Sequence, residues 1–209
     1  EMSYKPPFVV IDFETSENGK GSTEFYRPDF YVDSMAVSWL REDGATKSLF
    51  VQGEREIRRT LTSMLDIPWV AHNLQFEMGV IKCRFPELSD KVKWEADTMR
   101  LVQVWVNGGD KLAFETIYTD DDQLDALCRE TDPDEPKEKK PKQVSTAGLG
   151  LVKACARILK VPDHKEEAHT WIRENAPEWK KGKKEGRFLN HLPADILERY
   201  NIGDTERTL

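Results

Sequence analysis

A short apolar run near the start of the chain leads into two carboxylates, and this pairing limits what the chain can fold into. Residues 8–13 read FVVIDF and predict a buried strand. Asp12 and Glu14 are two residues apart, so a strand would direct both side chains to one face. Two carboxylates in such a place are unfavourable unless a cation or hydrogen bonds compensate them. The pair alone leaves two interpretations open, a metal site and an exposed strand end.

The other patterns predict an α/β domain with a mixed, five-stranded sheet flanked by helices. Apolar residues four apart at Ile57, Leu61 and Leu65 indicate one of these helices. The polar stretch 41–47 predicts a turn between two antiparallel strands. Further strands are expected at 35–40, 48–52, 69–72 and 94–98, and helices at 54–65, 74–84, 99–106, 149–159 and 193–209. No dinucleotide-binding glycine pattern follows the first strand, which argues against a Rossmann fold.

A third carboxylate is placed at the beginning of a predicted helix. Residues 72–77 read HNLQFE and follow a short strand. Asn73 is a favourable N-cap residue, and Glu77 lies in the first turn, where a carboxylate suits the helix dipole. Taken alone, this pattern is explained well by a capped helix with an acidic first turn.

A fourth carboxylate lies on the last predicted helix. Tyr200 and Asp204 are four residues apart, so both would point to the same side of that helix. Gly203 within a helix costs about 1 kcal/mol relative to Ala, so we expect a close approach of backbone or substrate there.

The three patterns are far more specific together than separately. They resemble, in chain order, the three exonuclease motifs of the tyrosine subgroup of the DEDD superfamily. The matching segments read FVVIDFET, VAHNLQFE and ERYNIGDTE. The chain is similar to the proofreading 3′–5′ exonuclease domain of family A DNA polymerases. The resemblance runs from about residue 7 to the end and is weak over 120–142 and 166–187. It implies a ribonuclease H-like fold.

The resemblance also implies a metal-dependent removal of nucleotides from DNA 3′ ends. Two Mg²⁺ or Mn²⁺ ions would be bound, with Asp12 between them and Tyr200 orienting the attacking water. The implied catalytic residues are Asp12, Glu14, Glu77, Tyr200 and Asp204, of which the four carboxylates are the metal ligands. Thr15, Asn73 and Phe76 match positions that contact the terminal nucleotide, although Phe76 is equally well explained as a core residue.

Glu77 departs from the usual pattern of this family, which has Asp at the matching position. Its side chain is one methylene longer and still suits Mg²⁺. Similar Asn-x-x-Phe-Glu variants resemble those of bacteriophage polymerases, so we expect a phage-type enzyme. The longer side chain predicts that the second ion is held loosely.

Composition limits the partners that fit. The formal net charge is −7, which argues against a protein that coats nucleic acid by charge alone. We expect a single-stranded DNA 3′ end as the substrate and a polymerase domain C-terminal in the same natural chain.

No apolar run approaches the roughly 20 residues of a membrane span, and no signal peptide opens the chain. We therefore expect no membrane partner and a cytoplasmic location, in the host if the protein is phage-encoded.

The domain boundaries follow from the two ends and one unusual segment. Glu1 precedes Met2, so we expect Met2 to be the native start, and a helical pattern still runs at Leu209. Residues 1–209 are therefore expected to be one exonuclease domain, the N-terminal part of a longer polymerase. Residues 120–142 are rich in charge and Pro and predict a mobile insertion, with a docking segment as the alternative.

Three other functions remain open from the sequence. One is an exoribonuclease of the same superfamily, because sugar preference depends on contacts near the 2′-position. The second is a catalytically weak module that binds single-stranded nucleic acid, and the third is a domain that docks a partner. The basic run at 180–187 could follow a phosphate backbone or form a solvated loop.

Overall fold

The computed structural model describes residues 4–17, 20–21, 25–102, 151, 154–155, 163–175, 189 and 191–209. The chain divides into two compact units, Glu1–Thr98 with Pro162–Leu209, and Met99–Val161. The first unit holds the sheet and all the site residues discussed below. The predicted insertion at 120–142 and the basic run at 180–187 lie outside the described residues, as do half of the helix expected at 99–106 and most of the helix expected at 149–159.

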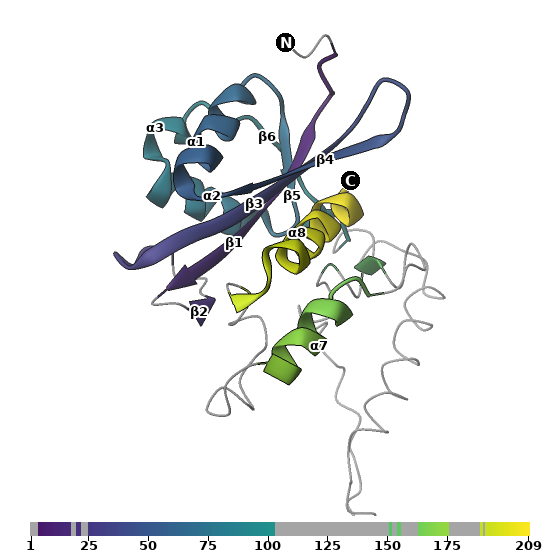
Figure 1. Ribbon diagram of the computed structural model, residues 1–209. Coiled ribbons are helices and arrows are strands. Elements are labelled where there is room, and N and C mark those ends of the chain that lie inside the picture. The colour runs from purple at the N-terminus through teal and green to yellow at the C-terminus, as the bar shows by residue number, and fades with distance from the viewer. Residues whose placement is uncertain are drawn as a thin grey trace, which may run out of the picture. The chain divides into compact units, whose positions relative to one another are not determined.

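The first unit is built on a mixed β-sheet (Figure 1). Five strands follow the order β4-β3-β1-β5-β6, and the two-residue β2 pairs with the end of β1. β1 is antiparallel to β3 and parallel to β5, so the predicted α/β class with a mixed five-stranded sheet is confirmed. The elements are β1 (Val9–Glu17), β2 (Lys20–Gly21), β3 (Phe30–Leu40), β4 (Thr46–Gln52), α1 (Glu54–Ser63), β5 (Trp69–Ala71), α2 (Leu74–Arg84), α3 (Pro86–Ser89), β6 (Trp94–Asp97), α7 (Glu166–Asn175) and α8 (Ala194–Thr208).

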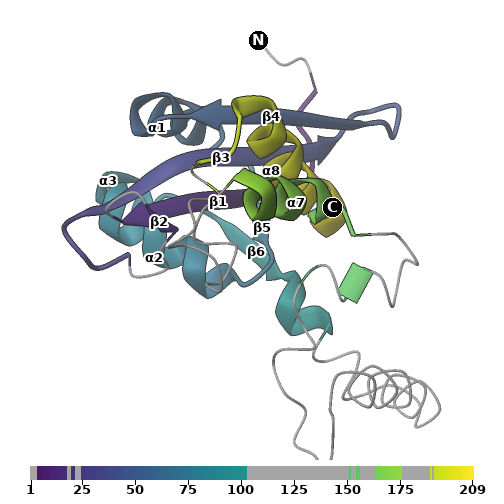
Figure 2. The same cartoon turned by 60° about the horizontal axis from the view of Figure 1, so that its bottom comes forward.

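Alternation along the central strand β1 separates an apolar layer from a polar one. Val9, Ile11 and Phe13 belong to the larger core cluster, together with buried residues of α1, α2 and α3. These helices lie on one side of the sheet and α8 on the other (Figures 1 and 2). Asp12 and Glu14, on the alternate positions, therefore face α8. Among the helices the structure describes, none combines the length and apolar character that a membrane crossing requires.

β1 is longer than its apolar pattern predicts. The sequence predicts a strand over 8–13, with Glu14 beyond its end, whereas β1 continues to Glu17. Thr15, Ser16 and Glu17 pair with Val32, Tyr31 and Phe30 of β3, and this backbone ladder extends the strand without apolar side chains. The interpretation of an exposed strand end is therefore wrong, since both carboxylates lie within the strand.

Hydroxyl groups dock α8 onto the sheet. Ser34 Oγ donates to Asn201 Oδ1 at 3.2 Å, and the hydroxyls of Ser38 and Thr205 are 2.7 Å apart. Ser38 Oγ is also 2.8 Å from Ser48 Oγ on β4. Ser34, Ser38, Asn201 and Thr205 are all buried, so these bonds satisfy groups that water does not reach. The small serines let the helix approach the strands closely.

An apolar cluster completes the attachment of α8. Leu197 and Tyr200 of α8 pack with Ala168 and Ile172 of α7. Arg199 of α8 also forms hydrogen bonds to both carboxylate oxygens of Glu167 on α7. The two helices are therefore held together as well as to the sheet.

Removing the Ser38 hydroxyl should loosen α8. In Ser38→Ala, Ser48 and Thr205 each lose a buried partner, and we expect the free energy of unfolding to fall by about 1–2 kcal/mol. Urea denaturation followed by circular dichroism measures this change. The matched control is Ser63→Ala, whose exposed hydroxyl donates to the Thr60 carbonyl of its own helix. This control should change stability by less than about 0.5 kcal/mol. Equal effects of the two variants would contradict the role given to Ser38.

Candidate metal centre

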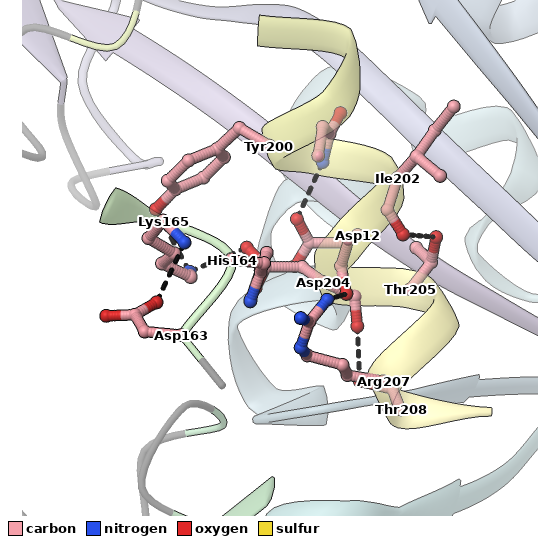
Figure 3. Close-up of polar contacts among 12 residues, drawn as sticks. Asp12, Asp163, His164, Lys165, Tyr200, Ile202, Asp204, Thr205, Arg207 and Thr208 are labelled. Carbon is pink, nitrogen blue, oxygen red and sulfur yellow. Dashed lines mark hydrogen bonds and ion pairs between the residues drawn. The ribbon is translucent and has the colours of Figure 1, made fainter. Parts of the chain in front are cut away.

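Three carboxylates converge where α8 crosses β1. Asp12 and Glu14 come from β1 and Asp204 from α8, and each offers one oxygen within 4.8 Å of the others. Asp12 and Glu14 are half-buried, whereas Asp204 is 5% exposed. Figure 3 shows Asp12 and Asp204 approaching each other between the strand and the helix. The structure thus brings together residues from the first and third sequence patterns.

Asn201 fixes the carboxylate of Asp12. Its Nδ2 donates to Asp12 Oδ2 at 2.7 Å, while its Oδ1 accepts from Ser34. Asn201 is fully buried, so its orientation is set by these two partners. Asn201 is not among the predicted site residues, although its position three residues before Asp204 places both on one side of α8.

Asp204 receives a hydrogen bond on each oxygen (Figure 3). His164 Nε2 donates to Oδ1 at 2.8 Å, and Lys165 Nζ donates to Oδ2 at 2.7 Å. Lys165 Nζ also donates to Tyr200 Oη at 3.0 Å and lies 4.4 Å from the centre of the tyrosine ring. Neither basic residue is predicted to lie here from the sequence, because both are far from Asp204 along the chain and no spacing connects them to it.

Gly203 makes room for this arrangement. A Cβ atom at this position would lie 2.3 Å from Cδ2 of His164, which is shorter than any tolerated contact. The expected close approach is therefore present, but the approaching group is a side chain of the same protein, not backbone or substrate.

Glu77 lies deeper than the other carboxylates. It is 2% exposed, and among the described residues its Oε2 has no hydrogen-bond partner. It lies outside the group whose oxygens are within 4.8 Å, yet burial and the charge of Asp12 raise its pKa well above the usual value. β5 is the parallel neighbour of β1 and leads directly into α2, which brings this side chain close enough for the charge of Asp12 to affect its pKa.

The cluster holds more negative charge than its surroundings compensate. Burial and the charge of Asp204 raise the pKa of Asp12 to about 8, against the opposing effects of Lys165 and Asn201. Burial and the charge of Asp12 raise the pKa of Glu14 well above its usual value. Burial also opposes ionisation of Asp204, but the bonds from His164 and Lys165 outweigh it and hold that pKa low. A bound divalent cation would favour the ionised form of every member.

Tyr200 stays protonated in this setting. It is 7% exposed, and burial together with the charge of Glu14 raises the pKa of its hydroxyl above the ordinary value. Since Tyr200 Oη accepts from Lys165, its own hydrogen remains available for donation. This hydroxyl can orient a water molecule but is a poor base.

The three residues expected to contact substrate lie on β1 and at the start of α2. Asn73 is the N-cap residue of α2, as predicted, but its side chain makes no capping bond. It adopts a left-handed conformation with φ 72°, in which its N–H donates to Asp97 Oδ1 at 3.1 Å, so the expected side-chain cap is wrong. Phe76 is partly buried against the core and lies beside the ring of Phe25, which agrees with its interpretation as a core residue. Thr15 follows the irregularity in the pairing of β1 with β3.

No protein-family model matches this sequence, and no curated protein matches it. The chemistry of the cluster is therefore inferred from its own geometry.

Replacing Asp12 by Asn should stabilise the protein when a chelator removes divalent ions. The folded protein holds the Asp12 proton up to about pH 8, whereas an unfolded chain releases it near its ordinary pKa of 3.8. The stabilisation that this proton gives the folded state is complete below pH 3.8 and is lost as the pH rises to about 8. Asp12→Asn should thus gain about 1 kcal/mol or more at pH 8, which raises Tm by about 2–4 °C, and less at pH 5.

Calorimetry at both pH values, in the presence of a chelator, measures this difference. Asp66→Asn is the matched control, because Asp66 is exposed and its pKa is lowered by Lys5. A destabilised Asp12→Asn at pH 8 would show that the cluster is not charge-strained.

Proposed function

We propose that this chain is a 3′–5′ exonuclease domain of the tyrosine subgroup of the DEDD superfamily, which removes nucleotides from DNA 3′ ends in proofreading for a family A DNA polymerase. The observation that carries the proposal is the meeting of Asp12, Glu14 and Asp204 within 4.8 Å. Three separate sequence patterns resemble the motifs of that family, and the first and third of them supply this cluster.

The fold is compatible with the proposal. β1, β3 and β4 form an antiparallel part of the sheet, and β5 and β6 continue it in parallel with β1. With helices on both faces, this arrangement is compatible with the ribonuclease H-like fold that the proposal implies.

The donors fit hard divalent cations. Mg²⁺ and Mn²⁺ prefer carboxylate oxygens, and the cluster offers three close together. The buried Oε2 of Glu77, which lacks a partner among the described residues, supports a cation in this region. Two such ions, when bound, would activate water and stabilise the charge on the reacting phosphate and the leaving 3′-oxygen.

Each side chain of the site would have its own role in the reaction. Asp12 would contact both ions, Glu14 and Asp204 would complete the first site, and Glu77 would hold the second. Asn201 keeps Asp12 in place through its bond to Oδ2. Tyr200 would donate its hydroxyl hydrogen to the attacking water, because burial keeps that group protonated.

The substrate and partner follow from the same proposal. Thr15, Asn73 and the exposed part of the Phe76 ring would contact the terminal nucleotide of a single-stranded DNA end. A polymerase domain would follow in the natural chain, and a phage-encoded enzyme would work in the cytoplasm of its host.

Digestion of 5′-labelled oligonucleotides tests the proposal. In Mg²⁺, the wild-type protein should shorten single-stranded DNA stepwise from the 3′ end, and a chelator should stop it. Asp12→Asn should lower the rate about a thousandfold or more, because several kcal/mol of transition-state stabilisation is lost. Asp66→Asn, an exposed carboxylate paired with Lys5, should cleave like the wild type.

Three results would contradict the proposal. RNA shortened in preference to DNA would favour the exoribonuclease instead. Binding of the oligonucleotide without shortening would favour a non-catalytic module. Cleavage that continues in excess chelator, or in Asp12→Asn, would exclude the metal mechanism.

A further inference from the structure

Lys165 places an ammonium group directly against the candidate metal ligands. Its Nζ is 2.7 Å from Asp204 Oδ2 and 3.0 Å from Tyr200 Oη. Favourable charge interactions also connect it with Asp12 and Glu14. The ammonium group therefore compensates the same negative charge that a metal ion would compensate.

This ammonium group uses an oxygen that a metal ion would need. Asp204 Oδ1 already accepts from His164, and Oδ2 accepts from Lys165. A divalent ion bound to Oδ2 would lie close to Nζ, where two cations repel each other strongly in a poorly hydrated site. The ion and the ammonium group cannot both be bound there favourably.

The backbone of Lys165 is fixed, whereas its side chain has a route to solvent. The Lys165 N–H donates to Asp163 Oδ1 at 2.7 Å, and the Lys165 carbonyl accepts from His169 N at 2.9 Å at the start of α7. The side chain of Lys165 is 19% exposed, so it is not sealed inside the protein. Rotation of a long, flexible side chain can thus remove the ammonium group while α7 stays in place.

We propose that Lys165 is an internal cation that competes with the divalent ion for Asp204 and leaves the cluster when that ion binds. This inference rests on the proposed metal site and adds a control on its loading. The exchange favours divalent ions, because a monovalent ion brings no more charge than the ammonium group it replaces. It also connects loading to Tyr200, whose hydroxyl oxygen is freed from Lys165 at the same time.

Binding of Mn²⁺ in the absence of nucleic acid tests the competition. Titration calorimetry should show that Lys165→Met binds Mn²⁺ about tenfold more tightly than the wild type, in the range typical of coupling between two ligands. Lys165→Arg keeps the charge and should stay close to the wild-type affinity. Lys5→Met is the matched control, since it removes the same charge from an exposed pair with Asp66 and should leave the affinity unchanged.

A measurement on the unaltered protein avoids any folding defect of the variants. Reductive methylation followed by peptide mass spectrometry reports how accessible each lysine amine is. Adding Mn²⁺ should raise the methylation rate of Lys165 several-fold and leave that of Lys5 unchanged.

The outcomes separate the two proposals. Mn²⁺ that binds Lys165→Met with equal or weaker affinity would overturn the competition alone, as would an unchanged or slower methylation of Lys165. Absence of Mn²⁺ binding in both the wild type and Lys165→Met would overturn the competition and the metal site together.

Discussion

Several carboxylates lie between β1 and α8, and the rest of this structure depends on how their negative charge is compensated. Asp12, Glu14 and Asp204 meet within 4.8 Å, and Glu77 adds a fourth carboxylate that is almost fully buried. Repulsion and lost hydration make such a group unfavourable by itself. Three neighbouring side chains stabilise these carboxylates by hydrogen bonds. Asn201 donates to Asp12, and His164 and Lys165 each donate to one oxygen of Asp204. Oε2 of Glu77 is buried without a hydrogen-bond partner among the described residues, and so is Nδ1 of His164.

Several features that look unrelated follow from holding these carboxylates in place. α8 must lie close to the sheet, and the hydroxyls of Ser34 and Ser38 on β3 form hydrogen bonds with it there. Gly203 has no Cβ to collide with His164, so a residue that is unfavourable within a helix stands where the histidine ring packs against α8. The opposite face of β1 carries Val9, Ile11 and Phe13 into the main core. The strand is thus stabilised by its apolar face and strained by its polar one.

Local periodicity made much of this predictable. The alternation of β1 places Asp12 and Glu14 on one face, and the helical spacing of Tyr200 and Asp204 places them on one side of α8, as the structure confirms. The extension of β1 to Glu17 was missed, because pairing with β3 forms it without an apolar pattern. The backbone conformation of Asn73 depends on Asp97, which is distant in sequence. Lys165 and His164 reach Asp204 only through the packing of α7 on α8, and nothing in their spacing indicates it.

The central claim is that Asp12, Glu14 and Asp204 bind a divalent metal ion. Crystals soaked in Mn²⁺ and measured for anomalous scattering at the manganese edge test it most directly. We predict an anomalous peak bound by oxygens of all three carboxylates, with the Lys165 ammonium group turned away from Asp204. A map without a peak there, in which Lys165 still contacts Asp204 at saturating Mn²⁺, would contradict the account.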